Sequence, residues 1–167
     1  MKILEREEYI NILQQDSNKS PIDSLEEKIK RAFDSRLNDK RGEPAVLHRN
    51  YTDRFFIEHN EINFKCDLLY YDSKIHTLYV FKTLSENTKI NKQRARDELN
   101  VWTQYPINLF EFAVREGYLV YNEDGKLRGE LVFTISDSRF YRKYIFDKNS
   151  EGILNNYQNF FRKVLNL

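Results

Sequence analysis

Four β-rich runs follow one another between Ala45 and Thr83, and they constrain the fold more than any other part of the chain. The runs read AVLHRN, RFFIEH, INFKCDLLYY and KIHTLYVFKT, with short polar stretches between them. β-branched and aromatic residues are enriched in strands, so each run predicts a strand. Asp72 and Ser73 lie between the last two runs, which predicts an antiparallel hairpin at that point.

Helical patterns occur on both sides of these strands. Residues 22–37 carry the clearest apolar stripe, with Ser20 as the N-cap and Pro21 in the first turn. Further helices are expected over residues 2–15, about 90–105 and about 152–165.

The last third of the chain adds more strands. The runs GYLVY and GELVFTI flank NEDGKLR, whose Asp124–Gly125 pair is typical of a tight hairpin turn. The run RFYRKYIF, residues 139–146, is a further strand candidate. This order of helices and strands predicts a mixed α/β (α+β) domain with a central mixed β-sheet flanked by helices.

Length and composition favour one domain over residues 1–167. Five glycines and three prolines leave no flexible linker to mark a second domain. No apolar run approaches the ~18–20 residues of a membrane span, so no membrane contact is expected. The start, MKILEREEYI, carries acids where a signal peptide needs an apolar stretch, so a cytoplasmic (intracellular) protein is expected.

Charge and cysteine content exclude several classes of site. The chain has 27 basic and 26 acidic residues, so its net charge does not by itself indicate a nucleic-acid partner. The one cysteine, Cys66, excludes an internal disulfide framework and a cysteine-rich zinc site. Its place in an apolar strand predicts a buried, inert thiol.

Glu26 lies on the apolar side of its expected helix. At about 100° per residue it falls inside the apolar stripe, between the directions of Phe33 and Leu37. A carboxylate on the core side of a helix is costly unless a cation, a metal or a hydrogen-bond donor satisfies it. The alternative to a functional acid is a rim carboxylate paired with a structural arginine or lysine.

Asp67 and Lys82 lie on the two strands of the expected hairpin. Aspartate is disfavoured in the middle of a strand, and Lys82 closes a mostly apolar row, so both positions are unusual. The hairpin would bring the two within a few residues of being opposite. The alternatives are a solvated outer face for Asp67 and a strand-end lysine whose charge reaches water. Strict alternation places these residues on one face of the first strand: Ile62, Phe64, Cys66, Leu68 and Tyr70.

This order of helix acid, strand Asp, hairpin, strand Lys and helix resembles the PD-(D/E)XK nuclease superfamily, which has the restriction-endonuclease-like fold. Members carry an Asp on one strand and an acid-x-Lys motif on the next, followed by a helix. Many add a Glu on the helix before the sheet. The resemblance covers about residues 22–136, centred on DLLYYDSKIHTLYVFK, and leaves outside it the helix at 2–15 and the strand and helix of about 138–167.

The resemblance implies metal-dependent hydrolysis of phosphodiesters with Mg²⁺ or Mn²⁺. Glu26 and Asp67 would be the metal ligands, and Lys82 would orient the attacking water or stabilise charge on the phosphate.

The chain departs from the family motif at Val80, which stands where the motif has its second acid. In some relatives that acid comes from the following helix, and here Glu98, with Asp97 beside it, would take the role. Glu86 is a weaker substitute. The expected catalytic set is therefore Asp67, Lys82, Glu26 and Glu98, and an ordinary exposed helix acid is the alternative for Glu98.

Basic residues beside aromatic ones suit phosphate contact and base stacking. DNA, with RNA as the alternative, is the expected partner, although helix charges often form a solvated face and strand aromatics often pack the core. The candidate nucleic-acid-binding residues are Lys89, Lys92, Arg94, Arg96, Arg139, Arg142 and Lys143.

A second interpretation keeps the scaffold without the catalysis. Because Val80 cannot bind a metal, the chain would then be a catalytically inactive binding or interaction protein. It would serve as a subunit of a nucleic-acid-processing complex, or as an inhibitor or accessory factor of a mobile element. A homodimer or another protein partner is open in either interpretation.

Overall fold

The computed structural model describes residues 19–42, 44–106 and 112–167, so the helix expected at residues 2–15 lies outside the described part. The elements, in chain order, are α2 (Pro21–Ala32), α3 (Asp34–Leu37), β1 (Val46–Ile57), β2 (Asn60–Asp72), β3 (Thr77–Leu84), α4 (Lys89–Asn100), a 3₁₀ turn (Val101–Gln104), β4 (Val114–Glu123), β5 (Lys126–Ser136), α5 (Ser138–Tyr144) and α6 (Lys148–Val164).

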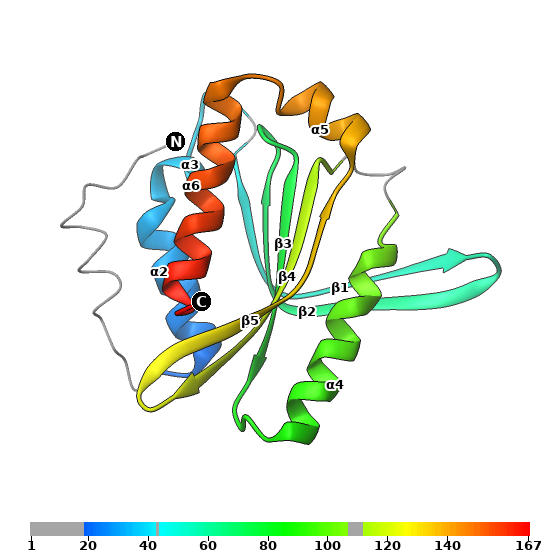
Figure 1. The fold of residues 1–167 in the computed structure, drawn as a ribbon, viewed down its shortest axis with the longest axis vertical. Coiled ribbons are helices and arrows are strands. Elements are labelled where there is room, and N and C mark those ends of the chain that lie inside the picture. Colours follow the sequence, from blue (N-terminus) through cyan, green and yellow to red (C-terminus); the bar gives the residue numbers. More distant parts are fainter. Residues whose placement is uncertain (1–18, 43, 107–111) are drawn as a thin grey trace.

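The strands form one five-stranded mixed sheet in the order β1-β2-β3-β4-β5 (Figure 1). The pairs β1/β2, β2/β3 and β4/β5 are antiparallel, and β3/β4 is parallel, with α4 as the crossover between them. Asp124 and Gly125 form the two-residue turn between β4 and β5, both with positive φ (53° and 74°), as such turns require. The predicted mixed α/β fold with a central mixed sheet is confirmed.

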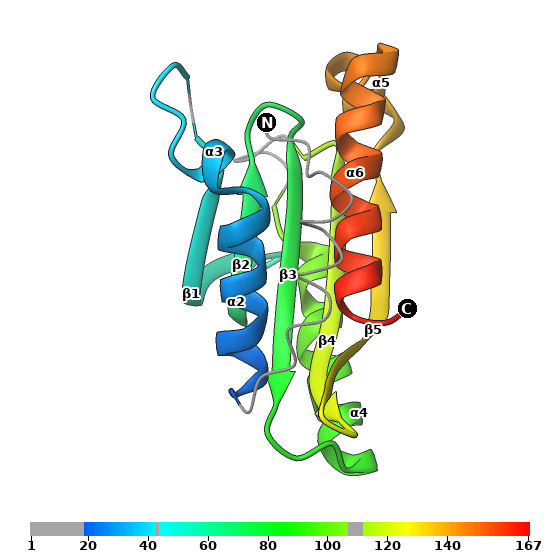
Figure 2. The same cartoon turned by 90° about the vertical axis from the view of Figure 1, so that its left-hand side faces the viewer.

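Helices cover both faces of the sheet: α2 and α6 pack on one face and α4 on the other (Figure 2). Each face therefore has its own core. The α2–α6 core includes Leu25, Ile29, Phe33, Leu68, Tyr70, Tyr79, Phe81, Tyr118, Tyr157 and Phe161. The α4 core includes Phe64, Cys66, Leu78, Val80, Ala95, Leu99, Trp102, Tyr105 and Leu119.

The pair of strands β1 and β2 bends midway. Arg49 pairs with Leu68 and Tyr51 with Cys66, but the ladder is interrupted between them, where Asn50 has a φ of 52°. Along β2, Cys66 comes before the bend and belongs to the α4 core, whereas Leu68 comes after it and belongs to the α2–α6 core. The expected single apolar face from Ile62 to Tyr70 is therefore wrong, because the bend shifts the alternation by one residue.

The sheet divides at the same bend. β2 and β3 pair only between Leu68–Asp72 and Thr77–Phe81. Beyond this ladder β2 continues in the long β1–β2 hairpin, which projects from the body of the molecule, while β3 runs on beside β4 as far as Leu84 (Figure 1). We call the point where β2 and β3 separate, at Asp67 and Lys82, the fork.

Two of the expected elements need correction. The run 139–146, expected to be a strand, lies mostly in helix α5, which the Asp137 side chain caps by accepting from the Arg139 and Phe140 amides. Its Phe140 and Tyr144 lie four residues apart, which puts both on the helix face that packs against the α2–α6 core. The helix expected at 22–37 is interrupted at Phe33.

No helix in the described part of the chain is long and apolar enough to cross a membrane.

Candidate functional site

Asp67, Lys82 and Glu98 meet at the fork, although they come from β2, β3 and α4. Lys82 Nζ lies 3.7 Å from Asp67 Oδ1 and 2.8 Å from Glu98 Oε2. One ammonium therefore joins a strand carboxylate and a helix carboxylate. The three side chains are partly exposed, at 24% for Asp67, 23% for Lys82 and 42% for Glu98, whereas the Glu98 Oε2 atom that meets Lys82 is itself buried.

Asp67 supplies a hydrogen-bond acceptor for the β3 backbone at the point where β2 and β3 separate. Its Oδ2 accepts hydrogen bonds from the Thr83 amide (2.6 Å) and the Thr83 hydroxyl (3.0 Å). The amide lies on β3 just beyond the last β2–β3 ladder pair, Leu68–Phe81, and the carboxylate supplies the acceptor there. This explains why an aspartate stands in the middle of a strand.

Leu78, Val80 and Lys82 are every second residue of β3, so they share one face of the sheet. Leu78 and Val80 belong to the α4 core, so Lys82 also lies on the α4 side. Burial of the ammonium disfavours its charged form, but the hydrogen bond to Glu98 and the charges of Asp67 and Glu98 outweigh burial and raise the pKa of Lys82. The side chain is therefore a permanent positive charge at neutral pH and not a general base.

Helix α4 brings Glu98 to the fork. Thr88 caps the helix by accepting from the Asn91 amide, and Ala95 and Leu99 are buried against the sheet. Glu98 precedes Leu99, so it lies at the edge of that buried face and reaches Lys82. The neighbouring Asp97 accepts instead from Gln93 at 3.0 Å.

Val80 and Cys66, which lie near the fork in sequence, are both buried in the α4 core. Val80, in the acid position of the motif, is 1% exposed and belongs to the α4 core. Cys66 is buried as expected, and burial raises the pKa of its thiol to about 12. A thiol with so high a pKa is a poor nucleophile at neutral pH.

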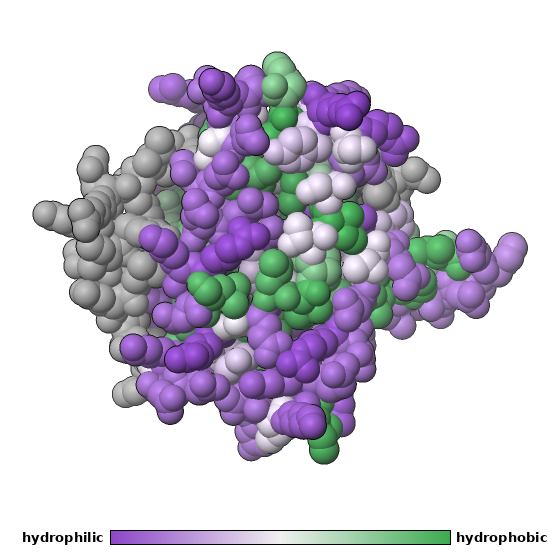
Figure 3. All heavy atoms as spheres, viewed as in Figure 1, coloured by the Kyte–Doolittle hydropathy of each residue, from purple (hydrophilic) through white to green (hydrophobic). Residues whose placement is uncertain are grey.

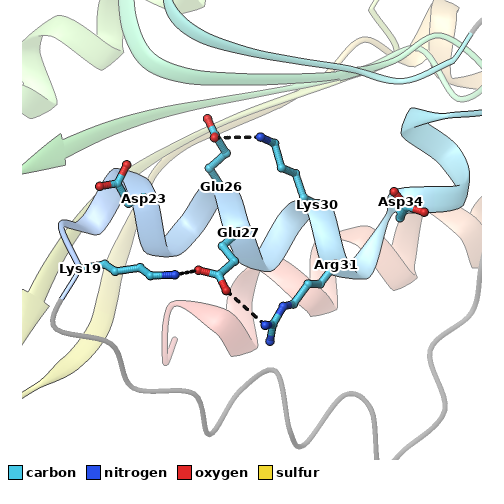
Figure 4. Close-up of a pocket in the computed structure, with 7 residues that line it drawn as sticks. All are labelled: Lys19, Asp23, Glu26, Glu27, Lys30, Arg31 and Asp34. Carbon is cyan, nitrogen blue, oxygen red and sulfur yellow. Dashed lines mark hydrogen bonds and ion pairs between the residues drawn. The ribbon is translucent and has the colours of Figure 1, made fainter.

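Glu26 is not part of the three-residue cluster at the fork. Its carboxylate pairs with Lys30 Nζ at 3.1 Å and with Arg49 Nε at 3.1 Å, and Arg49 also binds Asp23. Figure 4 shows Glu26 and Lys30 joined on α2. Helix α2 covers the sheet face opposite to Glu98, so the structure shows the rim carboxylate paired with structural cations, the alternative considered from the sequence.

The cluster offers a hard divalent cation two donors of the right chemistry, so water or substrate would have to fill the remaining positions. Asp67 and Glu98 offer carboxylate oxygens, which Mg²⁺ and Mn²⁺ prefer. Within the described residues no group of three His, Cys, Asp or Glu side chains could hold a metal ion. A cation there would rest on two carboxylates and water, beside the Lys82 ammonium.

The predicted nucleic-acid-binding residues fall into two groups, because α4 and α5 lie at opposite ends of the molecule (Figures 1 and 2). On α4, Arg96 forms a bidentate pair with Glu130 (2.9 and 3.0 Å), and Lys92 lies 4.3 Å from the centre of the Tyr121 ring. Lys89 and Arg94 are exposed. On α5, Arg139 and Lys143 lie over the rings of Phe140 and Tyr144, and Arg142 is exposed.

Thr83 and Asn50 shape the site without having been identified from the sequence. Thr83 holds the Asp67 carboxylate, and Asn50 marks the bend that opens the fork. Asn tolerates positive φ better than most residues, which is the one signal that pointed to the bend.

The chain matches no protein-family model, no curated protein and no solved structure.

Proposed function

We propose that the chain is a PD-(D/E)XK-like nuclease-fold domain that contacts DNA and hydrolyses phosphodiester bonds at the fork, with Mg²⁺ or Mn²⁺ as cofactor. The observation that carries the proposal is the meeting of Asp67, Lys82 and Glu98, from three separate elements, at one partly exposed point. The order of the Asp strand, the hairpin, the Lys strand and the following helix supports the resemblance.

Each residue has a role that follows from its charge and position. Asp67 and Glu98 would hold the cation, which when bound polarises the phosphate and lowers the pKa of its water. Lys82, whose pKa is raised, keeps its positive charge and stabilises the negative charge that develops on the phosphate oxygens. In the overall reaction the water oxygen bonds to phosphorus, the bond to the leaving sugar oxygen breaks, and that oxygen takes up a proton.

Cleavage of a plasmid and of a short duplex, with Mg²⁺ or Mn²⁺ and with EDTA, tests the enzyme. The wild type should cleave only with the metal, and Asp67→Asn should abolish cleavage. Lys82→Met should also lose cleavage but retain metal binding. Asp97→Asn is the matched control, because it removes a carboxylate next to Glu98 that points to Gln93. Unchanged cleavage by Asp67→Asn would place the chemistry elsewhere.

A catalytically inactive binding protein is the second candidate. The buried Val80 in the acid position favours it, as does the pairing of Glu26 with Arg49 and Lys30. Such a chain would act as a subunit of a nucleic-acid-processing complex or as an accessory factor or inhibitor of a mobile element. Duplex binding without cleavage, and without any stabilisation by Mn²⁺, would select this candidate over the enzyme.

A further inference from the structure

Three segments far apart in the sequence meet at the end of the sheet where β2 turns into β3. They are the loop 38–42 after α3, the turn 73–76 between β2 and β3, and the segment 138–148 with α5. Figures 1 and 2 both place them at this end. We call this surface the basic end, and define it by its cations: Lys40, Arg41, Lys74, Arg139, Arg142, Lys143 and Lys148.

Side-chain contacts join the three segments into one surface. The His76 ring of the turn stacks on the Tyr144 ring of α5, with centroids 3.6 Å apart. Lys143 Nζ lies 4.9 Å from the centre of that same Tyr144 ring. On the other side of the turn, Lys74 Nζ pairs with Asp39 Oδ2 of the loop at 3.3 Å. The cations are therefore carried on segments that support one another.

The basic end has an excess of positive charge. Lys40, Arg41, Arg142 and Lys148 are exposed, and no carboxylate of a described residue lies within ion-pair distance of them. At the fork and along α2, by contrast, the cations Lys82, Lys19 and Lys30 pair with carboxylates.

The carboxylates at this end already have partners. Asp39 is bound by Arg36, by Lys74 and by the Arg41 amide. Asp137 and Asp147 cap the first turns of α5 and α6. The seven cations outnumber these three carboxylates, so the basic end keeps a net positive charge.

We propose that the basic end binds the phosphate backbone of a nucleic acid. Cations spread over several segments follow a polyanion, and the exposed Phe146 (74%) beside them offers a ring for a base. An anionic membrane is the other polyanion to consider, but a membrane-binding helix needs an exposed apolar face. The apolar residues of α5, Phe140, Tyr141 and Tyr144, pack instead against the α2–α6 core. Figure 3 shows hydrophilic side chains over much of this end.

This inference extends the proposed function and rests on it only for the choice of a nucleic acid as the partner. Lys82 lies five residues along β3 from Thr77, the first residue after the turn, which is about 16 Å of strand. A nucleic acid bound at the basic end would therefore make its phosphate contacts away from the fork. Basic residues around the fork itself would not be needed to hold it.

Fluorescence anisotropy of a labelled duplex and of a labelled single strand, titrated in EDTA at several salt concentrations, tests the proposal. The wild type should bind at least one probe with steep salt dependence. The double variant Arg41→Gln/Arg142→Gln should lose about tenfold in affinity, and the slope of log K against log salt should fall by about 2 for a duplex, because each lost phosphate contact removes about 0.9. Both side chains are exposed, and an unchanged melting temperature checks the fold.

The matched control is Lys126→Gln/Lys163→Gln, which removes the same charge away from the basic end, beside the β4–β5 turn and in the last turn of α6 (Figure 1). It should change the affinity less than twofold. An equal loss in the control, or no salt-dependent binding by the wild type, would overturn the proposal. So would vesicles rich in phosphatidylserine that bind in an Arg41- and Arg142-dependent way when the nucleic acids do not. EDTA removes any metal, so the binding result is independent of cleavage at the fork.

Discussion

Replacing Asp72 by asparagine should lower the free energy of unfolding more than a substitution at the surface does. Asp72 is 1% exposed, and its carboxylate accepts four hydrogen bonds. Two come from Arg36, at 3.0 and 2.9 Å, one from the Lys74 amide at 2.9 Å and one from the Tyr157 hydroxyl at 2.7 Å. The residue thus joins α3, the β2–β3 turn and α6.

The size of the effect follows from the burial of Arg36. Its side chain is 1% exposed, so Asp72→Asn leaves a buried guanidinium without its main counter-charge. Breaking a buried ion pair from one side costs about 3–5 kcal/mol. At about 2–4 °C per kcal/mol for a chain of this size, the melting temperature should fall by about 6–20 °C. Urea unfolding followed by circular dichroism, with a thermal scan, measures both quantities.

Asp39→Asn is the control, because Asp39 also contacts Arg36, at 3.4 Å, and Lys74, but from the rim. It should be destabilised far less than Asp72→Asn, because exposed ion pairs contribute little to stability. An Asp72→Asn protein that unfolds within about 1 kcal/mol of the wild type would refute the reasoning, since Arg36 would then need no counter-charge inside the core.

Three further predictions concern other parts of the structure. Gly117→Ala should cost about 1–3 kcal/mol, because its new methyl would lie 2.3 Å from Phe133 Cε1, and the cost measured by urea unfolding should largely vanish in a Phe133→Ala background. Lys82→Met should be less stable than the wild type at pH 8. The pKa of Lys82 is raised in the folded state, so the charged lysine stabilises the fold fully below its unfolded pKa of about 10.4, and this stabilisation is lost as the pH rises through the folded pKa. The difference in unfolding free energy between the wild type and Lys82→Met should therefore narrow in strong alkali. Cys66, whose pKa burial raises to about 12, should react with a thiol reagent at pH 8 only as fast as the chain unfolds; fast reaction of the folded protein would show that the thiol is accessible.

Local patterns in the sequence predicted most of the fold. The β-rich runs, the Asp124–Gly125 turn and the apolar stripe after Pro21 each depend on neighbouring residues. The turn forms as expected and the runs form strands, but the first two runs, expected as separate strands, join in β1, and the helix after Pro21 ends at Ala32. The strand prediction for residues 139–146 was wrong because the aromatic residues of this run suit a strand by composition and a helix by spacing. Packing of Phe140 and Tyr144 on a core built by distant segments decides between the two.

The candidate site was predictable only in part for the same reason. Asp67, Lys82 and Glu98 follow the chain order of the resemblance, and the structure brings them together. The partner of Glu26, Arg49, lies on β1 and could not be inferred from the helix that carries Glu26. The bend at Asn50 depends on one positive φ, which leaves no trace in a periodic pattern.

Titration of the wild-type protein with Mn²⁺, followed by calorimetry, tests the central claim most directly. Binding should be present in the wild type and in Asp97→Asn, and lost in Asp67→Asn, because Asp67 lies beside Lys82 and Glu98 at the fork whereas Asp97 points to Gln93. If the wild type binds no Mn²⁺, or if Asp67→Asn binds it equally well, the fork is not the metal site and the proposed chemistry does not take place there.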